Sequence, residues 1–236
     1  MALDISSDLL TLIPARGGSK GISGKNMHPL AGTPLIGWTI KQVINSDTPT
    51  RLAVTTDCAD IAGYASSLGA EIVSRPVELA SDSATSESAL NHALEAIPNS
   101  NGVNHVMFLQ ATSPLRLAGT IDRAFQKYKD THVDSVVGVV KSSPFHWRME
   151  AGSSVALYDA KVRKRRQDFQ PEDILMRETG SLYITKRTFL VKNQNRISGN
   201  IGLFEMDLIE GLDIDTLADL RIAEILIEEG FYDFNQ

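Results

Sequence analysis

The sequence contains a single cysteine and no long apolar run. With Cys58 alone among 236 residues, neither an intrachain disulfide nor a zinc site built from several cysteines can form. This composition is typical of the reducing cytoplasm. The first residues, MALDISSDLL, lack the basic start and apolar stretch of a signal peptide, and no segment approaches the roughly 20 apolar residues of a membrane helix. We therefore expect a cytoplasmic protein with no membrane segment.

An excess of positive charge is also missing. The chain has 23 lysine and arginine residues against 29 aspartate and glutamate residues, which gives a formal net charge of −6. General nucleic-acid binding requires a broad positive field, so we expect no nucleic-acid partner. A small anionic ligand is compatible with this balance, because a few local cations can dominate the potential of one cleft.

Short apolar segments alternate with segments of helical periodicity along most of the chain. This alternation predicts an α/β fold in which a mostly parallel sheet is covered by helices on both faces. The length fits one large domain, residues 1–236. The predicted strands are residues 9–13, 52–55, 71–73, 105–109, 135–140 and 180–185, and the predicted helices lie near residues 36–44, 59–68, 89–97, 121–128 and 217–227.

The alternation breaks between about residues 142 and 178, which we interpret as an insertion. Its most charged part is a basic run at residues 161–166. A solvated face is the usual role of such a run, and a nucleic-acid patch would need interleaved aromatic residues, whereas Tyr158 and Phe169 only flank it. A third interpretation, capture of an acidic substrate or a phosphate, is the one we favour for Arg166.

A glycine-rich basic loop follows the first predicted strand. Residues 13–26 read IPARGGSKGISGKN and include the cations Arg16, Lys20 and Lys25. Glycines let the backbone approach a ligand and offer N–H groups to phosphate oxygens, and cations suit a polyphosphate. The loop matches neither a standard P-loop nor the dinucleotide glycine pattern. Because ligands of parallel sheets bind beyond the carboxyl ends of the strands, we favour phosphate binding over an ordinary flexible loop.

Two aspartates precede the last predicted helix. In extended backbone, alternate side chains share a face, so Asp213 and Asp215 point the same way, roughly 7 Å apart. Two such carboxylates suit Mg²⁺, which also accepts water and phosphate oxygens as ligands. Alternatively, Asp215 or Thr216 caps the helix, with Asp219 completing the cap. The pattern is weak by itself, and capping and metal binding can coexist.

Two further polar segments follow predicted strands. In RPVELASDSATS, residues 75–86, the hydroxyls and Asp82 are candidates for helix capping, while Arg75 and Ser86 are candidates for contacts with a nucleotide base or ribose. In LQATSPLR, Gln110 lies where a ligand would bind, and Arg116 would cap a helix or pair with a carboxylate. The five histidines share no spacing, so we assign none of them to a metal or to proton transfer.

Taken together, these segments resemble the CMP-sialic acid synthetases (acylneuraminate cytidylyltransferases). The matching pieces occur in the family's order and span nearly the whole chain: LIPARGGSKGISGKN, TTD, RPVELASDSATS, FLQATSPLR, RETGSLYI and DIDT. The first and fourth pieces are specific. The resemblance implies a three-layer α/β/α fold of the nucleotide-diphospho-sugar transferase type. It also implies that CTP and a nine-carbon acidic sugar react to give a CMP-sugar and pyrophosphate, with Mg²⁺ as cofactor.

The resemblance also implies roles by position. It implies a homodimer in which the inserted segment, about residues 142–178, contributes to dimerisation and covers the partner's active site. The implied catalytic residues are Arg16, Lys25 and Asp215. The implied nucleotide contacts are Ala15, Arg16, Ser19, Lys25, Asn26, Arg75 and Ser86; the implied sugar contacts are Gln110, Arg166, Arg177 and Thr179; and the implied metal ligands are Asp213 and Asp215.

One departure from the family pattern concerns the acceptor sugar. Enzymes for N-acetylneuraminate carry asparagine before the glycine of the sugar loop, where this chain has Thr179. Threonine offers one hydroxyl in place of the paired donor and acceptor of an amide. Legionaminate-like and pseudaminate-like sugars therefore stay open as substrates. A related nucleotidyltransferase with a different acceptor and a nucleotide-binding module without turnover are rival interpretations of the same motifs.

Overall fold

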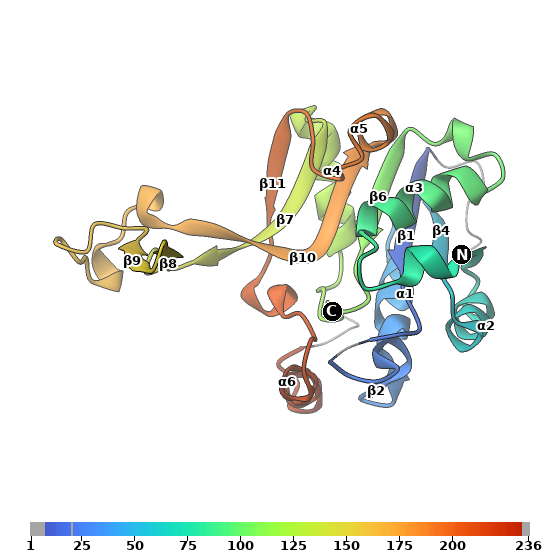
Figure 1. The fold of residues 1–236 in the computed structure, drawn as a ribbon, viewed down its shortest axis with the longest axis horizontal. Coiled ribbons are helices and arrows are strands. Elements are labelled where there is room, and N and C mark those ends of the chain that lie inside the picture. Colours follow the sequence, from blue (N-terminus) through green and yellow to red (C-terminus); the bar gives the residue numbers. More distant parts are fainter. Residues whose placement is uncertain (1–7, 20, 233–236) are drawn as a thin grey trace.

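A central seven-stranded sheet organises the computed structural model, which describes residues 8–19 and 21–232 (Figure 1). The strand order is β11-β7-β10-β6-β1-β4-β5. All neighbouring strands are parallel except that β10 runs antiparallel to both β6 and β7. The predicted, mostly parallel sheet is therefore confirmed. The strands are β1 (Leu9–Pro14), β4 (Arg51–Thr56), β5 (Glu71–Ser74), β6 (His105–Leu109), β7 (Ser135–Ser142), β10 (Leu175–Lys186) and β11 (Ile201–Glu205).

Helices cover both faces of this sheet, which confirms the predicted three layers. Along β1, Leu9 and Ile13 belong to one core cluster and Leu10 and Leu12 to the other, as the two-residue period of a strand requires. The first core cluster includes α1, α2 and α4, and the second includes α3 and α5. The helices are α1 (Leu35–Asn45), α2 (Ala59–Ser67), α3 (Ser86–Ala96), α4 (Thr120–Thr131) and α5 (Arg187–Asn193).

A third apolar cluster lies around the last helix, α6 (Leu217–Glu228). Its buried residues Leu220 and Ala223 pack with Ile22 of the glycine-rich segment and with Ile214 between the two aspartates. The small sheet of β2 (Pro29–Leu30) and β3 (Thr33–Pro34) adjoins the same cluster through Leu30. This packing brings two segments about 190 residues apart in the sequence to the same part of the molecule.

Strands β7 and β10 continue together beyond the body of the protein (Figure 1). Residues 141–177, which we call the arm, carry at their far end the hairpin of β8 (Trp147–Glu150) and β9 (Ser153–Ala156). In the arm, β10 pairs with β7 through Leu175 and Met176. Strand β10 is therefore longer than its predicted core, residues 180–185, because its first part is ordered by pairing rather than by burial.

Several elements escaped prediction because their local patterns are weak. Helix α5 has only seven residues, and β11 is an edge strand whose Ile201 and Leu203 are exposed. Lys20 and the first seven residues, which bear on the predictions for the loop cations and the amino terminus, lie outside the described residues. Among the residues described, no helix has both the length and the apolar character needed to cross a membrane.

Candidate active site

The polar loops that follow β1, β5 and β6 meet in one cleft with a volume of about 370 Å³. Its walls come from the glycine-rich loop, from residues 75–86, from the end of β6 and from the segment before α6. This position agrees with the rule that parallel sheets bind ligands beyond the carboxyl ends of their strands. The predicted site residues that line the cleft are Arg16, Ser19, Lys25, Asn26, Arg75, Ser86, Gln110, Asp213 and Asp215.

Lys25 connects the glycine-rich loop to the two aspartates. Its Nζ donates a hydrogen bond to the main-chain oxygen of Ile214 at 2.7 Å and forms an ion pair with Oδ1 of Asp215 at 3.0 Å. Gly21 permits this close approach, because a Cβ there would lie 2.2 Å from the main-chain oxygen of Asp215. The structure therefore places the basic loop directly against the aspartate segment.

Arg16 connects the same loop to residues 75–86. Its Nη1 forms an ion pair with Oδ1 of Asp82 at 2.8 Å and lies 3.4 Å from the main-chain oxygen of Ala80. The Nδ2 of Asn26 donates to the main-chain oxygen of Arg16 at 2.9 Å, which ties the two ends of the loop together. Of the candidate helix caps in this segment, the hydroxyl of Thr85 is confirmed as the cap of α3, whereas Asp82 pairs with Arg16 instead.

The Thr55-Thr56-Asp57 segment anchors two parts of the cleft. The N–H of Gly17 donates to Oδ1 of Asp57 at 2.9 Å, which holds the glycine-rich loop. Arg75 is buried, and its Nη2 donates to the main-chain oxygen of Thr55 at 2.5 Å. Burial lowers the pKa of Arg75 from its usual value, while the nearby Asp57 opposes that change. The segment thus fixes the positions of the glycine-rich loop and of a buried cation.

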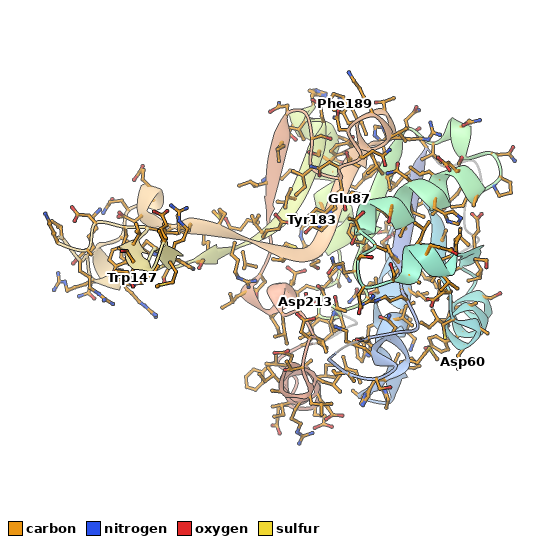
Figure 2. The ribbon with its side chains drawn as sticks, in the orientation of Figure 1. Asp60, Glu87, Trp147, Tyr183, Phe189 and Asp213 are labelled. Atoms are coloured by element: carbon orange, nitrogen blue, oxygen red, sulfur yellow. The ribbon has the colours of Figure 1, made fainter. Side chains whose placement is uncertain are left out.

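Asp213 is a half-buried carboxylate at the cleft (Figure 2). Burial raises the pKa of Asp213. The hydrogen bond with the Thr112 hydroxyl lowers this pKa, and the charge of the neighbouring Asp215 raises it. Oδ1 of Asp213 has no hydrogen-bond partner within the described part of the chain. A buried carboxylate oxygen without a partner, beside a second carboxylate, fits a hard divalent cation such as Mg²⁺. Because the described residues contain no cluster of three or more candidate metal-ligating side chains, substrate oxygens or water would complete the coordination.

The structure also shows which residues of this segment cap the last helix. Thr216 is the N-cap of α6, and its side chain accepts from the N–H of Asp219. Asp219 accepts from the N–H of Thr216 at 2.8 Å, which completes a capping box. Capping is therefore performed by Thr216 and Asp219, and the carboxylates of Asp213 and Asp215 are left for the cleft.

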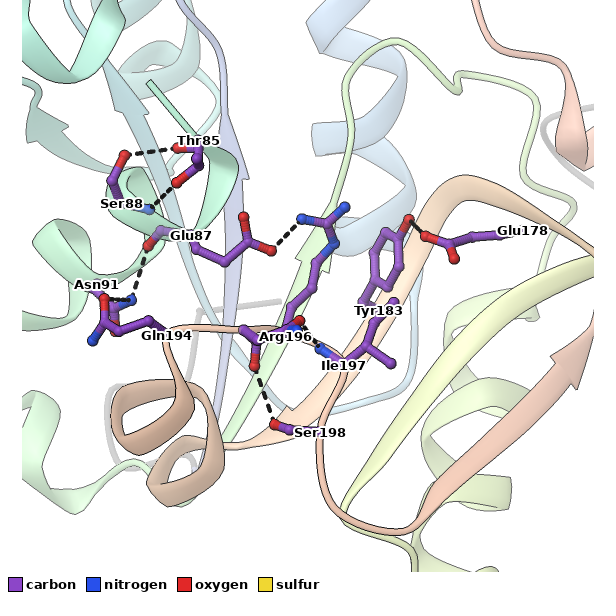
Figure 3. Close-up of polar contacts among 11 residues, drawn as sticks. Thr85, Glu87, Ser88, Asn91, Glu178, Tyr183, Gln194, Arg196, Ile197 and Ser198 are labelled. Atoms are coloured by element: carbon purple, nitrogen blue, oxygen red, sulfur yellow. Dashed lines mark hydrogen bonds and ion pairs between the residues drawn. The ribbon is translucent and has the colours of Figure 1, made fainter. Parts of the chain in front are cut away.

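The first turn of α3 forms another part of the cleft wall through Thr85 and Ser86. The side chain of Thr85 accepts from the N–H of Ser88 at 3.1 Å. Behind this turn, Glu87 pairs with Arg196 at 2.5 Å, and the Arg196 guanidinium lies 4.5 Å from the centre of the Tyr183 ring (Figure 3). The loop after α5 thereby holds the start of α3, a contact for which the sequence carries no local signal.

Arg116 is fully buried and holds the end of β6 against β10. Its Nη2 donates to the main-chain oxygens of Gln110 at 2.8 Å and Ser181 at 2.5 Å, and its Nη1 donates to Thr39 and Gln42. Burial lowers the pKa of Arg116 to about 10. The interpretation of Arg116 as a helix cap or carboxylate partner was wrong, because these hydrogen bonds position the backbone beside Gln110.

Four of the implied site residues are not among those that line the cleft. Ala15 is buried in the core, where its N–H donates to the main-chain oxygen of Thr55 at 3.0 Å. The hydroxyl of Thr179 donates to the main-chain oxygen of Gly138 at 3.1 Å and accepts from the N–H of Ser181. Arg166 and Arg177 line a separate groove at the base of the arm. Their contacts with nucleotide or sugar stay predictions.

Gly180, which follows Thr179, lies close to the cleft. Its φ of 73° is in the left-handed region, where glycine is favoured. A Cβ at this position would lie 3.1 Å from Oε1 of Gln110 and 3.9 Å from Oδ2 of Asp213. The pairing of β10 with β7 is irregular here, between Glu178 and Tyr183. This irregularity brings the predicted sugar loop beside Gln110 and Asp213.

Comparison with known proteins finds similar chains and similar folds. The cytidylyltransferase family matches residues 10–229. N-acylneuraminate cytidylyltransferase A of Danio rerio is 34% identical over 224 residues, which are 93% of this chain and 50% of that protein. Post-translational flagellin modification protein B of Campylobacter coli is 30% identical over 232 residues, which are 94% of this chain and 96% of that protein. The chain thus spans about half the length of the N-acylneuraminate cytidylyltransferases it matches.

Two solved structures share the fold. CMP:2-keto-3-deoxy-manno-octonic acid synthetase complexed with CTP has a TM-score of 0.72 at 16% identity, with 95% of this chain and 100% of that chain covered. The 4-diphosphocytidyl-2C-methyl-D-erythritol synthase of Anaerococcus prevotii has a TM-score of 0.63 at 11% identity, with 94% and 99% covered. At these identities the likeness concerns the fold alone.

Proposed function

This chain belongs to the cytidylyltransferase family, and on that premise we propose that it transfers CMP from CTP to the anomeric hydroxyl of a sialic-type acid, releasing pyrophosphate. One observation supports this most strongly. Lys25 of the basic loop contacts Asp215 in a cleft that Arg16, Arg75 and Asp213 also line. Phosphoryl transfer depends mainly on positioning and charge neutralisation, and this cleft gathers the groups for both.

The residues of the loop would bind and stabilise the triphosphate. We propose an in-line attack of the sugar hydroxyl on the α-phosphorus of CTP. Arg16, Lys25 and the loop N–H groups would neutralise the charge that develops on the departing pyrophosphate. Arg75 and Ser86, which also line the cleft, would contact the nucleoside. Gln110, at the end of β6, would orient the acceptor sugar.

Asp213 and Asp215 would hold Mg²⁺. When bound, such an ion polarises a phosphate and lowers the pKa of a coordinated hydroxyl. The ion pair with Lys25 holds the Asp215 carboxylate at the edge of the basic loop. No histidine is among the described residues that line the cleft. The proton of the sugar hydroxyl would therefore pass to a carboxylate or to water.

A legionaminate-like or pseudaminate-like acceptor is the second candidate. The hydroxyl of Thr179 is occupied by the backbone of Gly138 and Ser181, so this side chain has little to offer an acyl group of the sugar. In addition, the relative that the chain covers almost completely is named for flagellin modification and not for N-acylneuraminate. Both observations concern the acceptor and leave the proposed use of CTP unchanged.

The arm supports the proposal of a homodimer. Trp147 and Met149 in β8 are 57% and 68% exposed, an unusual state for large apolar side chains on a hairpin. Arg166 and Arg177 line the groove at the base of the arm and would act on an acidic sugar bound by the partner. We place this dimer in the cytoplasm, in agreement with the single cysteine.

Product analysis tests the proposal. The protein is incubated with CTP, Mg²⁺ and either N-acetylneuraminate, legionaminate or pseudaminate, and pyrophosphate and the CMP-linked sugar are measured, the latter by mass spectrometry. We expect one of the three sugars to give a stoichiometric product, and chelation of the metal to abolish it. Thermal stabilisation by CTP without pyrophosphate release would instead favour a binding module without turnover. Pyrophosphate release with an unrelated acceptor would refute the sugar class.

A further inference from the structure

Two described cations of the glycine-rich loop line the cleft. Each of them is paired with a carboxylate of the same cleft. Arg16 pairs with Asp82 at 2.8 Å, and Lys25 pairs with Asp215 at 3.0 Å. The described cations lining the cleft are Arg16, Lys25 and Arg75, and the carboxylates are Asp82, Asp213 and Asp215, so their formal charges cancel. A strongly negative triphosphate would therefore meet a site whose described positive groups are already engaged.

The two ion pairs differ in what surrounds the carboxylate. Asp215 lies next to Asp213, where a bound cation would offset both charges. Asp82 belongs to a different segment, between β5 and α3, and its partner Arg16 is a group that the triphosphate needs. With a phosphate bound to Arg16, the Asp82 carboxylate would lie beside another anion, which is unfavourable. Asp82 and the phosphate therefore compete for one guanidinium.

The segment that carries Asp82 is a short connection between β5 and α3. It begins with the short helix Val77–Ala80 and ends at Thr85, the N-cap of α3. The Ser81 hydroxyl donates to the main-chain oxygen of Glu78 at 2.9 Å, so the segment is also held within itself. Across to the glycine-rich loop, Arg16 reaches both Asp82 and the main-chain oxygen of Ala80.

We propose that Asp82 is a counter-ion of Arg16 that must release it when the triphosphate binds. The use of CTP in this inference rests on the proposed function. The pair is displaceable, because the side chains of Arg16 and Asp82 are 31% and 54% exposed and exposed ion pairs are weak. Arginine binds phosphate oxygens more strongly through paired, charge-assisted hydrogen bonds. Asp82 therefore lowers the affinity for CTP.

Binding measurements on Asp82→Asn test this proposal. Calorimetric titration with CTP and Mg²⁺, without sugar, should give a dissociation constant about two- to fivefold lower for Asp82→Asn than for the wild type at low ionic strength. The difference should shrink as salt is added, because salt screens exposed charges. The matched control is Asp60→Asn, which removes the same charge from the exposed first turn of α2 and should leave the dissociation constant unchanged.

Two results would overturn the proposal. One is unchanged or weaker CTP binding in Asp82→Asn; an accompanying fall in kcat would mean that Asp82 orients Arg16 in the reacting complex. The other is an equal effect of Asp60→Asn, which would indicate a general charge effect. Inorganic tripolyphosphate serves as a second ligand, because it tests the competition for Arg16 without the nucleoside. If tripolyphosphate binds more tightly to Asp82→Asn but CTP does not bind at all, the proposed function fails and the counter-ion role stands.

Discussion

The body and the arm of this protein are stabilised in different ways. In the body, β1 is buried along nearly its whole length, with Leu10, Leu12 and Ile13 at 0% exposure. In the arm, all four residues of β8 are exposed (Figure 2). The arm depends instead on a small cluster in which Phe145 contacts Tyr158 and Phe169. The body thus has its own core, whereas the arm exposes large apolar side chains such as Trp147 and Met149.

Loss of charge in the cleft of the body should have the largest effect on turnover. Removing one group that stabilises the transition state typically lowers turnover by about 10²–10³. We expect Arg16→Ala and Asp215→Asn to show losses of this size in pyrophosphate release while they keep the thermal stability of the wild type. Lys127→Ala, which removes an exposed cation from α4, is the matched control. Near-normal turnover in either variant would contradict the assignment of the site.

Replacing one buried and one exposed arginine compares how much the body and the arm contribute to the free energy of unfolding. Arg116→Leu removes the short, charged hydrogen bonds to the main-chain oxygens of Gln110 and Ser181, which keep only donors at 3.4 Å, at a cost of about 1.5–3 kcal/mol each. We therefore expect a loss of about 3 kcal/mol in the free energy of unfolding, measured by urea denaturation. Arg148→Leu, in the exposed β8, should change it by less than about 0.5 kcal/mol. Similar losses in both variants would show that the arm is as tightly integrated as the body.

A glycine substitution tests the close contact between the loop and the aspartate segment. Gly21→Ala places a Cβ 2.2 Å from the main-chain oxygen of Asp215, so the loop must move away from the aspartates. Because displacements of about 1 Å can cost up to 10²-fold in rate, we expect kcat/KM for CTP to fall at least about tenfold. Gly63→Ala in α2, where a Cβ meets nothing within 4 Å, is the control and should be unaffected. Equal activity of the two variants would argue against this contact.

On the arm, Trp147→Ser tests whether exposed apolar surface serves dimerisation. Buried tryptophans are frequent hot spots of interfaces, so the dimer dissociation constant should rise about tenfold or more. Sedimentation measures this constant, and urea denaturation should show the body equally stable in both proteins. A dimer as tight as that of the wild type would show that the arm does not form the interface.

The pH dependence of stability should show the smallest effect. Burial raises the pKa of Asp213, so the folded protein holds this proton more tightly than the unfolded chain does. The resulting stabilisation is present at low pH and is lost as the pH rises through the folded pKa. Without metal at neutral pH, Asp213→Asn should raise Tm by about 2 °C, and this gain should vanish below about pH 4. A lower Tm for Asp213→Asn at neutral pH would contradict this sign.

Much of the body follows from local patterns. The predicted strand at residues 105–109 coincides with β6, and the alternating apolar helices and strands correspond to the observed layers. Strand β11 was not predicted, because its Ile201 and Leu203 face solvent and Gly202 interrupts the apolar pattern. The hairpin of the arm was missed for the same reason, since an exposed strand lacks the burial that produces a readable period.

In the candidate site, local sequence patterns predicted the segments but not the partner of every residue. Residue types and the position of each loop after a strand predicted which segments line the cleft. The role of Arg116 was misread, because its partners come from α1, β10 and the end of β6. Asp82 was one of the candidate caps, although its partner Arg16 is 66 residues away in the sequence (82 minus 16). A charged residue near a helix start is consistent with several partners until the neighbouring loops are known.

The sequence by itself determined the chemistry of each segment: the glycine-rich basic loop, the paired aspartates and the alternation that builds a parallel sheet. Periodicity and residue type are local properties, so they are legible without a structure. Only the tertiary structure decided which cation meets which carboxylate, as in the pairing of Lys25 with Asp215. That pairing depends on the strand order and on the packing of α6 against the glycine-rich segment, both of which arise from burial of apolar side chains distant in the sequence.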